Sequence, residues 1–350
     1  MAEGVAMLAT GQRVFRRFWY PVMPEALLRA GRPVPFTLLG TEIVLWWGKD
    51  GPAAVTDRCP HRGAKLSLGF VDADVPDGPA IACPYHGWAF GADGRCRKVP
   101  QAHEPLRGMK GGTTGHHAAL RYGWVWVALE DPIAPIPEIA EAADPAFRQI
   151  DEFHEEWAVS GLRLMENSFD MAHLSYVHAN TFGILEEPRP APVEIEHTPW
   201  GFVMRGEAPV TNKGISKELI RSNEERTVRL IEGRWFLPFM RASRIDYPTG
   251  LTHVLVTAAT PIDDRRSMIC QWVYRNDTEA DSPAEKVIAF DRAVTTEDRL
   301  VLESTTWDVP LGMSEELHMP SDKPGIEMRR RLATLLAEHG EAEARLAPAG

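Results

Sequence analysis

Cysteine is scarce in this sequence, with only four cysteines among 350 residues. A disulfide framework needs more cysteines than this in a chain of such length. Cys96 and Cys270 have no metal-ligating residue types beside them, and we interpret them as structural thiols. This usage is typical of a reducing compartment, so we expect a cytoplasmic protein.

Long hydrophobic runs and an excess of basic residues are also missing. No segment approaches the roughly 18 apolar residues that a membrane helix needs, and the N-terminus lacks the apolar core of a signal peptide. The formal net charge of -11 argues against a nucleic-acid groove, because such grooves depend on clustered Lys and Arg. We therefore expect a soluble globular protein that binds neither membranes nor nucleic acids.

The first third of the chain consists of short β-rich runs separated by Gly, Pro and Asp, which predicts a small antiparallel β domain. A proline-rich segment follows and favours neither a strand nor a long helix, so we place a domain boundary near Asp131. The predicted strands of this domain cover residues 41–47, 53–58, 80–85 and 121–129.

The remaining two thirds of the chain mix helical and strand patterns, with the strands grouped rather than strictly alternating with helices. This layout is typical of the α+β class. The predicted strands include residues 252–260 and 267–275, and the predicted helices cover residues 161–178, 283–304 and 325–339.

Two of the cysteines lie in loop-like motifs that also contain histidine, CPHRGAKLSLG and CPYHGWAF. Cys59 and His61 form a CxH pair, and Cys83 and His86 form a CxxH pair. Two thiolates and two imidazoles can bind one tetrahedral Zn or a [2Fe-2S] cluster. Structural zinc sites usually pair like ligands within a loop, whereas each loop here offers one of each, which favours the cluster.

These two motifs resemble the cluster-binding loops of the Rieske family. The resemblance implies that Cys59, His61, Cys83 and His86 hold a Rieske [2Fe-2S] cluster. Neither loop has the extra cysteine that respiratory Rieske proteins carry. The cluster is therefore similar to the low-potential kind found in oxygenases and Rieske ferredoxins.

A second constellation lies in MENSFDMAHLSYVH, which places Asp170, His173 and His178 in a Dx2Hx4H arrangement. Two histidines and a carboxylate with open positions suit mononuclear Fe(II) that reacts with O2. Residues five apart differ by about 140° on a regular helix, so His173 and His178 cannot both reach one metal from an undistorted helix. Either the helix ends between them or it carries a π-bulge.

This segment resembles the catalytic domain of Rieske non-haem iron oxygenases. The resemblance implies that His173 and His178 bind the iron and that Asp170 connects the iron to a cluster in the neighbouring subunit, close to that subunit's His86. Asn167 matches a family asparagine near the iron.

The third iron ligand should be a carboxylate far downstream, where Glu297, Asp298 and Glu303 are all available. Family members show an ED pair in which the Asp binds iron, so we choose Asp298 by resemblance. Helical periodicity agrees, because Val294, Asp298 and Val301 share one helix face.

The resemblance also implies a fold class and the boundaries of the domains. We expect an α+β protein with an all-β Rieske domain over residues 16–131. An α+β catalytic domain with an antiparallel sheet and helices, of helix-grip type, should cover residues 132–335. An N-terminal segment, residues 1–15, and a charged tail, residues 336–350, flank these domains.

The implied function is that of a terminal oxygenase, a monooxygenase or dioxygenase. It uses O2 and electrons that originate from NAD(P)H and arrive through a separate ferredoxin or flavin reductase. The chain resembles the homotrimeric type that includes vanillate, dicamba and methylxanthine demethylases and saxitoxin-type hydroxylases. We therefore expect hydroxylation or O- or N-demethylation of a small organic substrate. Two alternatives are a Rieske electron-transfer or redox-sensing protein without turnover, and a structural zinc module.

The substrate cavity should adjoin the iron ligands and be mainly apolar, as small-molecule sites usually are. Large apolar side chains near the expected ligands are candidates for its lining. These candidates are Phe169, Leu174, Trp235, Phe239, Phe290 and Val294.

Overall fold

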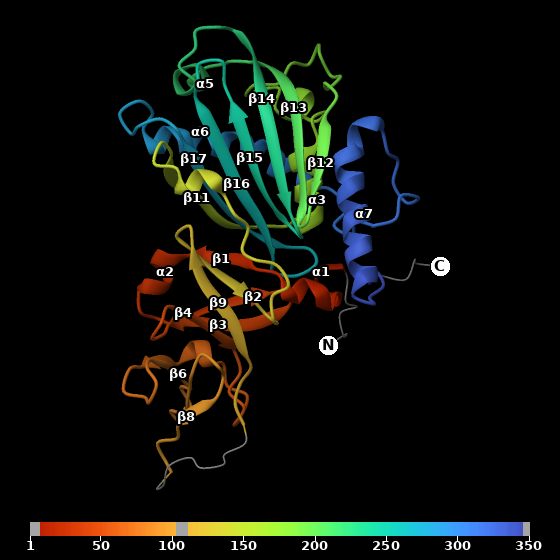
Figure 1. Cartoon of the computed structure of the whole chain (residues 1–350). Coiled ribbons are helices and arrows are strands. Elements are labelled where there is room, and N and C mark those ends of the chain that lie inside the picture. The colour runs from red at the N-terminus through yellow and green to blue at the C-terminus, as the bar shows by residue number, and fades with distance from the viewer. Residues whose placement is uncertain (1–7, 103–110, 346–350) are drawn as a thin grey trace. The chain divides into compact units, whose positions relative to one another are not determined.

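The computed structural model of the chain describes residues 8–102 and 111–345 (Figure 1). Residues 1–7 of the predicted N-terminal segment and residues 346–350 of the predicted tail lie outside this part. The chain forms two compact units. One is Phe15–Pro135, and the other is Ile136–Gly350 together with Met1–Val14.

The Phe15–Pro135 unit is built mainly from antiparallel strands. β-branched and aromatic residues such as those of TEIVLWW fill its core, with four consecutive buried residues in that strand. In its described part, six strands form one sheet in the order β1-β10-β9-β4-β3-β2. The elements of this sheet and its flanking helices are η1 (Arg13–Arg17), β1 (Tyr20–Pro24), α2 (Glu25–Arg29), β2 (Val34–Leu38), β3 (Thr41–Trp47), β4 (Pro52–Thr56), β9 (Gly115–Arg121) and β10 (Trp124–Ala128).

A smaller antiparallel sheet carries the two cysteine motifs. Among the described residues it has four strands in the order β5-β6-β7-β8. Cys59 follows β4, and Cys83 follows the three buried residues of β6. The elements are η2 (Leu66–Leu68), β5 (Phe70–Asp72), β6 (Ala80–Ala82), β7 (Ala89–Phe90) and β8 (Cys96–Lys98).

The second unit is organised around a single antiparallel sheet. Its described strands number seven, in the order β11-β17-β16-β15-β14-β13-β12. The central strands β16 and β17 are buried along nearly their whole length, which fits their rich content of Val, Ile, Trp and Ala. The strands are β11 (Arg148–Trp157), β12 (Glu194–Thr198), β13 (Gly201–Thr211), β14 (Arg226–Phe236), β15 (Met240–Asp246), β16 (Thr252–Pro261) and β17 (Ser267–Arg275).

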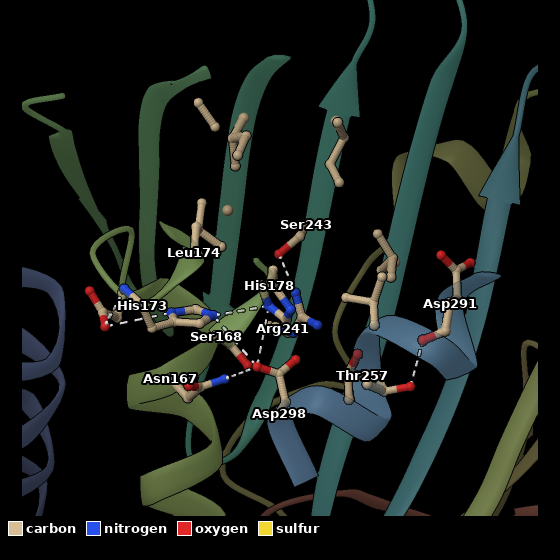
Figure 2. Close-up of a pocket in the computed structure, with 18 of the residues that line it drawn as sticks. Asn167, Ser168, His173, Leu174, His178, Arg241, Ser243, Thr257, Asp291 and Asp298 are labelled. Carbon is tan, nitrogen blue, oxygen red and sulfur yellow. Dashed lines mark hydrogen bonds and ion pairs between the residues drawn. The ribbon is translucent and has the colours of Figure 1, made fainter. Parts of the chain in front are cut away.

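Helices from distant parts of the chain lie over one face of this sheet (Figure 2). The longest is α6, and α7 packs on α3, where Arg329 forms ion pairs with Glu166 and Glu316. The helices are α1 (Leu8–Gly11), η3 (Ala140–Ala143), α3 (Gly161–Phe169), α4 (Leu174–Val177), α5 (Ile215–Leu219), α6 (Ala284–Leu302), η4 (Pro320–Asp322) and α7 (Lys323–Glu338). None of the helices in the described part combines the length and the apolar character that a membrane crossing requires.

Candidate active site

The first cysteine motif forms a tight loop closed by its own backbone. The Cys59 N–H donates to the Ala64 carbonyl at 2.8 Å, and the Gly63 N–H donates to the Cys59 carbonyl at 2.9 Å. Gly63 has a φ of 74°, a conformation that favours glycine over residues with a Cβ. The loop therefore presents Cys59 and His61 from one rigid turn.

The second motif repeats this loop with the same hydrogen bonds. The Cys83 N–H donates to the Trp88 carbonyl at 2.8 Å, and the Gly87 N–H donates to the Cys83 carbonyl at 2.9 Å. Gly87 has a φ of 72°. The two loops thus share one backbone design, although the histidine comes two residues after cysteine in the first and three after it in the second.

The four side chains of these loops provide a donor set that fits a [2Fe-2S] cluster. Cys59 and Cys83 are buried free thiols in one core cluster, and burial raises the pKa of the Cys59 thiol. The rings of His61 and His86 lie 4.7 Å apart between centroids. Both Nδ1 atoms are buried and lack a hydrogen-bond partner in the described part of the chain. Two orphaned imidazole nitrogens beside two thiols match the ligand chemistry of a Rieske cluster.

The segment that carries the Dx2Hx4H motif is not one continuous helix. Helix α3 ends at Phe169, and the single turn α4 lies between His173 and His178. His178 has φ −98° and ψ 22°, outside the regular helical region. The helical turn that begins at His173 therefore ends at Val177, before His178, and residues 161–178 contain no π-helix, so the first of the two expected alternatives holds.

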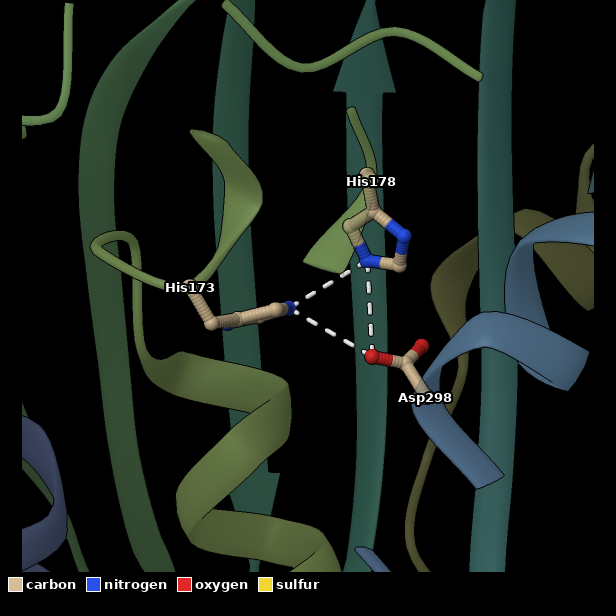
Figure 3. Close-up of side chains that lie close together, drawn as sticks. All are labelled: His173, His178 and Asp298. Atoms are coloured by element: carbon tan, nitrogen blue, oxygen red, sulfur yellow. Dashed lines mark hydrogen bonds and ion pairs between the residues drawn. The ribbon is translucent and has the colours of Figure 1, made fainter. Parts of the chain in front are cut away.

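The imidazoles of His173 and His178 and the carboxylate of Asp298 converge on one point (Figure 3). The two Nε2 atoms lie 3.3 Å apart. The Asp298 Oδ1 atom lies 3.5 Å from His173 Nε2 and 3.4 Å from His178 Nε2. Ligand atoms about 2 Å from one metal ion lie about 3 Å from one another, so this triangle fits a mononuclear metal.

The outward-facing nitrogens of both imidazoles face carboxylates. His178 Nδ1 lies 3.0 Å from Glu297 Oε2, which also accepts a hydrogen bond from the Thr181 hydroxyl at 2.8 Å. His173 Nδ1 lies 3.5 Å from Asp170 Oδ2, at ion-pair distance but without hydrogen-bond geometry. The hydrogen bond with Glu297 therefore fixes the tautomer and orientation of His178.

Asn167 contacts the predicted metal carboxylate directly. Its Nδ2 atom donates to Asp298 Oδ1 at 3.0 Å, across the gap between α3 and α6 (Figure 2). Asp170, at the end of α3, accepts hydrogen bonds from the backbone N–H groups of Ala172 and His173 at 2.7 and 3.2 Å. Both side chains therefore help to shape the site.

The ionisation of the site reflects competition between burial and opposite charge. Burial raises the pKa of Asp298, but hydrogen bonding and the charge of His178, with His173 and Asn167, bring it below its usual range. Burial lowers the pKa of His178, whereas Asp298 and Glu297 raise it, and the net direction is upward. A cation at this point is thus electrostatically favoured.

The three downstream carboxylates that the sequence offered have distinct positions. Asp298 faces both Nε2 atoms, and Glu297 meets the opposite side of His178. Glu303 accepts hydrogen bonds from the Ala158 N–H at 3.1 Å and from Arg299 at 2.9 Å, away from the histidines. Of these three carboxylates, Asp298 alone faces both Nε2 atoms.

A cavity of about 140 Å³ adjoins the histidines and Asp298. Leu174, Phe290 and Val294 line it, three of the six side chains that the sequence nominated. The other three do not line this cavity. Phe169, Phe202 and Trp235 form a buried aromatic cluster, with ring centroids 5.3 and 5.2 Å apart. The Phe239 ring lies against Gly161.

One end of the cavity is polar and follows a row across three neighbouring strands. Arg241 on β15 pairs with Thr257 on β16, and Thr257 pairs with Gln271 on β17. The Thr257 hydroxyl donates to Gln271 at 2.8 Å, and Arg241 donates to Ser243 at 2.8 Å. Burial lowers the pKa of Arg241 to about 10, which leaves it charged at neutral pH. We call Arg241, Thr257 and Gln271 the polar row.

Several residues that shape the site were not nominated from the sequence as functional. The sequence offers Glu297 only as an alternative ligand, and its place beside Asp298 in the ED pair is a usable signal. Arg229, Arg241 and Asp291 line the cavity. Charged side chains of these types usually lie at the protein surface. The strand register and the helix packing bring these three into the cavity, and neither can be predicted from residue type.

Comparison with known families gives two matches on this chain. Residues 18–114 match the Rieske [2Fe-2S] domain. Residues 157–338, over half of the chain, match the vanillate O-demethylase oxygenase C-terminal domain. The two matches contain the two constellations described above.

Individual relatives are similar over nearly the whole chain. Methylxanthine N1-demethylase NdmA from Pseudomonas putida is 27% identical over 346 residues, covering 96% of this chain and 93% of that protein. The structure of NdmA from P. putida CBB5 with caffeine superposes with a TM-score of 0.81 at 25% identity, over 93% and 92% of the two chains. Dicamba monooxygenase bound to dicamba shares the fold, with a TM-score of 0.78 at 21% identity over 94% and 99% of the two chains.

These matches confirm the predicted α+β fold class with an N-terminal all-β domain. They also confirm an oxygenase rather than a protein for electron transfer alone, because the oxygenase domain is present. The chain therefore belongs to the Rieske oxygenases, which combine a [2Fe-2S] cluster with mononuclear iron and use O2 and electrons supplied by a reductase.

Proposed function

We propose that this chain is the terminal oxygenase component of a system that hydroxylates, or O- or N-demethylates, a small organic substrate. Its electrons come from NAD(P)H through a separate ferredoxin or flavin reductase. The convergence of the two Nε2 atoms and one Asp298 oxygen within 3.5 Å, beside a cavity, is the observation that carries this proposal.

The proposed ligands follow from the two constellations. We assign the cluster to Cys59, His61, Cys83 and His86, and the iron to His173, His178 and Asp298. The proposed domain limits, residues 16–131 and 132–335, are supported by the compact unit Phe15–Pro135.

When bound, the cluster supplies single electrons and the iron supplies open coordination positions for O2. The protein's part is orientation. Glu297 and Asp170 face the Nδ1 atoms of the two histidines, so that each Nε2 atom is directed at the metal position. Asn167 donates to Asp298 Oδ1 and holds that carboxylate in place.

Insertion of one oxygen atom of O2 with release of the other as water consumes two electrons and two protons. Burial and the neighbouring Asp291 carboxylate raise the pKa of Glu152 well above its usual range. The pKa of Asp291 is lowered, because His253 and Glu152 offset the effect of its burial. The raised pKa favours the protonated form of Glu152, next to a carboxylate that lines the cavity. We assign this pair as a proton store.

The apolar side chains of the cavity wall would limit the access of water to the reacting position. Leu174, Phe290 and Val294 are apolar, and Phe182 lies with its ring 4.8 Å from that of His178. A dry wall around the metal favours transfer of oxygen to the substrate over release of reduced oxygen species.

We propose a homotrimer in which Asp170 of one subunit meets His86 of the next. Heterologous contacts of this kind close into a ring when the rotation permits. The Asp170 side chain remains 30% exposed, which leaves room for a second partner. Asp170→Asn should keep both metal centres but slow the oxidation of the reduced cluster in a single turnover. Near-normal oxidation in this variant, or a monomeric active protein, would overturn the bridging role.

Turnover with a surrogate reductase tests the proposed function. The holoprotein, NADH and a panel of methoxy- and N-methyl-aromatic compounds should show O2 uptake coupled to formaldehyde or hydroxylated product. Asp298→Ala should keep the red-brown Rieske absorption and lose this turnover. O2 uptake that no compound stimulates, or an Asp298→Ala variant as active as the wild type, would contradict the proposal.

A further inference from the structure

A buried arginine without a carboxylate partner lines the cavity away from the polar row. Arg229, on β14, is only 4% exposed. Its Nε and Nη2 atoms are buried and find no hydrogen-bond acceptor among the described residues. No carboxylate of the described part of the chain lies within ion-pair distance of it. Its guanidinium lies over the rings of Phe182 and Tyr247, at 4.5 and 5.2 Å from their centroids.

The other buried arginines of this unit have partners. Arg275 forms an ion pair with Asp277 at 2.5 Å, and Arg329 forms one with Glu166 at 2.5 Å. Arg241 donates to Ser243 and feels the charges of Asp298 and Asp291. A buried cation without a counter-charge is unfavourable. Arg229 therefore differs from Arg275 and Arg329, each of which has a carboxylate partner.

Arg229 lies close to the metal site but in a different part of the cavity from the polar row. The Phe182 ring is 4.8 Å from the His178 ring and 4.5 Å from the Arg229 guanidinium, so one aromatic ring connects the two. Arg241 pairs with Trp235 on β14, six residues beyond Arg229, which is about 20 Å along the strand. The two cavity arginines, Arg229 and Arg241, therefore line different parts of the cavity.

The cavity wall around Arg229 is apolar. Val210, Ile231 and Ile245, on the strands β13, β14 and β15, line the cavity with it. An anion entering this region would find one cation and few competing polar groups, in a low-dielectric setting where a charge pair is strong. A neutral ligand would leave the guanidinium without a partner.

Building on the function proposed above, we propose that Arg229 binds an anionic oxygen group of the substrate. The substrate class is then a small, mainly apolar aromatic molecule with a carboxylate or phenolate at one end and the oxidised carbon at the other. The guanidinium suits this role because it stays charged and offers several donors to oxygen anions. Attraction to the two aromatic rings is the competing explanation, and it would make Arg229 a purely structural residue.

Binding to the metal-loaded protein without O2 tests this assignment by calorimetry. The probes are 2-, 3- and 4-methoxybenzoate, the matching methoxybenzamides and the matching methoxyphenols. In the wild type, at least one benzoate should bind about thirty-fold or more tightly than its amide if the anion is a carboxylate. A phenol is neutral at pH 7, so binding of a phenol with release of its proton would identify a phenolate instead. Arg229→Gln should abolish this preference while leaving amide binding and the Rieske spectrum unchanged.

Two further variants control for folding and for general charge. Arg229→Lys keeps the cation and should retain a preference for the anion. Arg226→Gln, an exposed position on the same strand that pairs with Glu187, should behave as wild type. An anion preference that survives in Arg229→Gln, or a wild type that binds no anion more tightly than its amide, would overturn the assignment.

These binding results are separate from the result for oxygenation. Anion binding that depends on Arg229, without any O2-dependent product, would support the role of Arg229 and refute the proposed function. Oxidation of neutral compounds alone would support the proposed function and refute the role of Arg229.

Discussion

Gly183 lies where a side chain would displace the two histidines that we propose as iron ligands. Its N–H donates to the His178 carbonyl at 2.7 Å. A Cβ atom added at Gly183 would lie 2.9 Å from the His178 carbonyl carbon, and closer still to the Leu174 carbonyl oxygen. Ordinary contacts begin at 3.4 Å, and both obstacles are backbone atoms, which cannot rotate away. The contact with the Leu174 oxygen is the limiting one, so Gly183→Ala requires a shift of about 1 Å in the segment between the two histidines.

Such a shift exceeds the tolerance of a metal site, where ligand distances vary by about 0.2 Å. We expect Gly183→Ala to weaken iron binding by about 100-fold or more, the upper range for loss of a supporting residue. Overpacking should also reduce the free energy of unfolding by about 1–3 kcal/mol. The cluster should be unaffected, because its ligands belong to the other compact unit.

The assay is iron content after dialysis against a weak chelator, compared with the Rieske absorption of the same sample. Gly312→Ala is the matched control, because a Cβ atom there meets no atom within 4 Å. A Gly183→Ala protein that retains the mononuclear iron as firmly as Gly312→Ala would refute the proposed role of the segment between the histidines.

Further predictions concern the residues around the site. Glu297→Gln should weaken iron binding about 10- to 100-fold, measured by chelator competition, because a carboxamide orients His178 less firmly. Iron binding should also weaken as the pH falls through the raised pKa of His178, since the proton and the metal compete for the imidazole; iron retention that does not change with pH would contradict this. Arg329→Ala should lower the free energy of unfolding in urea by about 1–3 kcal/mol, because Glu166 and Glu316 lose their buried partner but keep Arg163, whereas Arg330→Ala, at an exposed position, should change it by about 0.5 kcal/mol or less.

The sequence predicts the elements of the second unit well where periodicity is strong. The strand predicted over residues 267–275 agrees with β17, and the helix predicted over residues 283–304 agrees with α6 to within two residues at each end. Both are long and have consistent apolar patterns. The helix predicted over residues 161–178 stops at Phe169 instead, because Asp170 accepts the N–H groups that begin the next turn.

The cavity lining could be predicted only in part. Leu174, Phe290 and Val294 follow the metal ligands in sequence or share their helix, so proximity along the chain identifies them. Trp235 also has a large apolar side chain, but it packs in an aromatic cluster instead of lining the cavity. This distinction depends on strand register. Arg229 is placed inside the cavity by the fold, against the tendency of arginine to remain exposed.

The iron and sulfide content of each chain, measured with electron paramagnetic resonance of the reduced protein, tests the two-centre assignment most directly. The wild type should contain three irons and two acid-labile sulfides. His178→Ala should lose one iron and keep the Rieske signal, and His61→Ala should lose the signal and keep the mononuclear iron. Loss of the Rieske signal in His178→Ala, or an intact signal in His61→Ala, would contradict the assignment of the two centres.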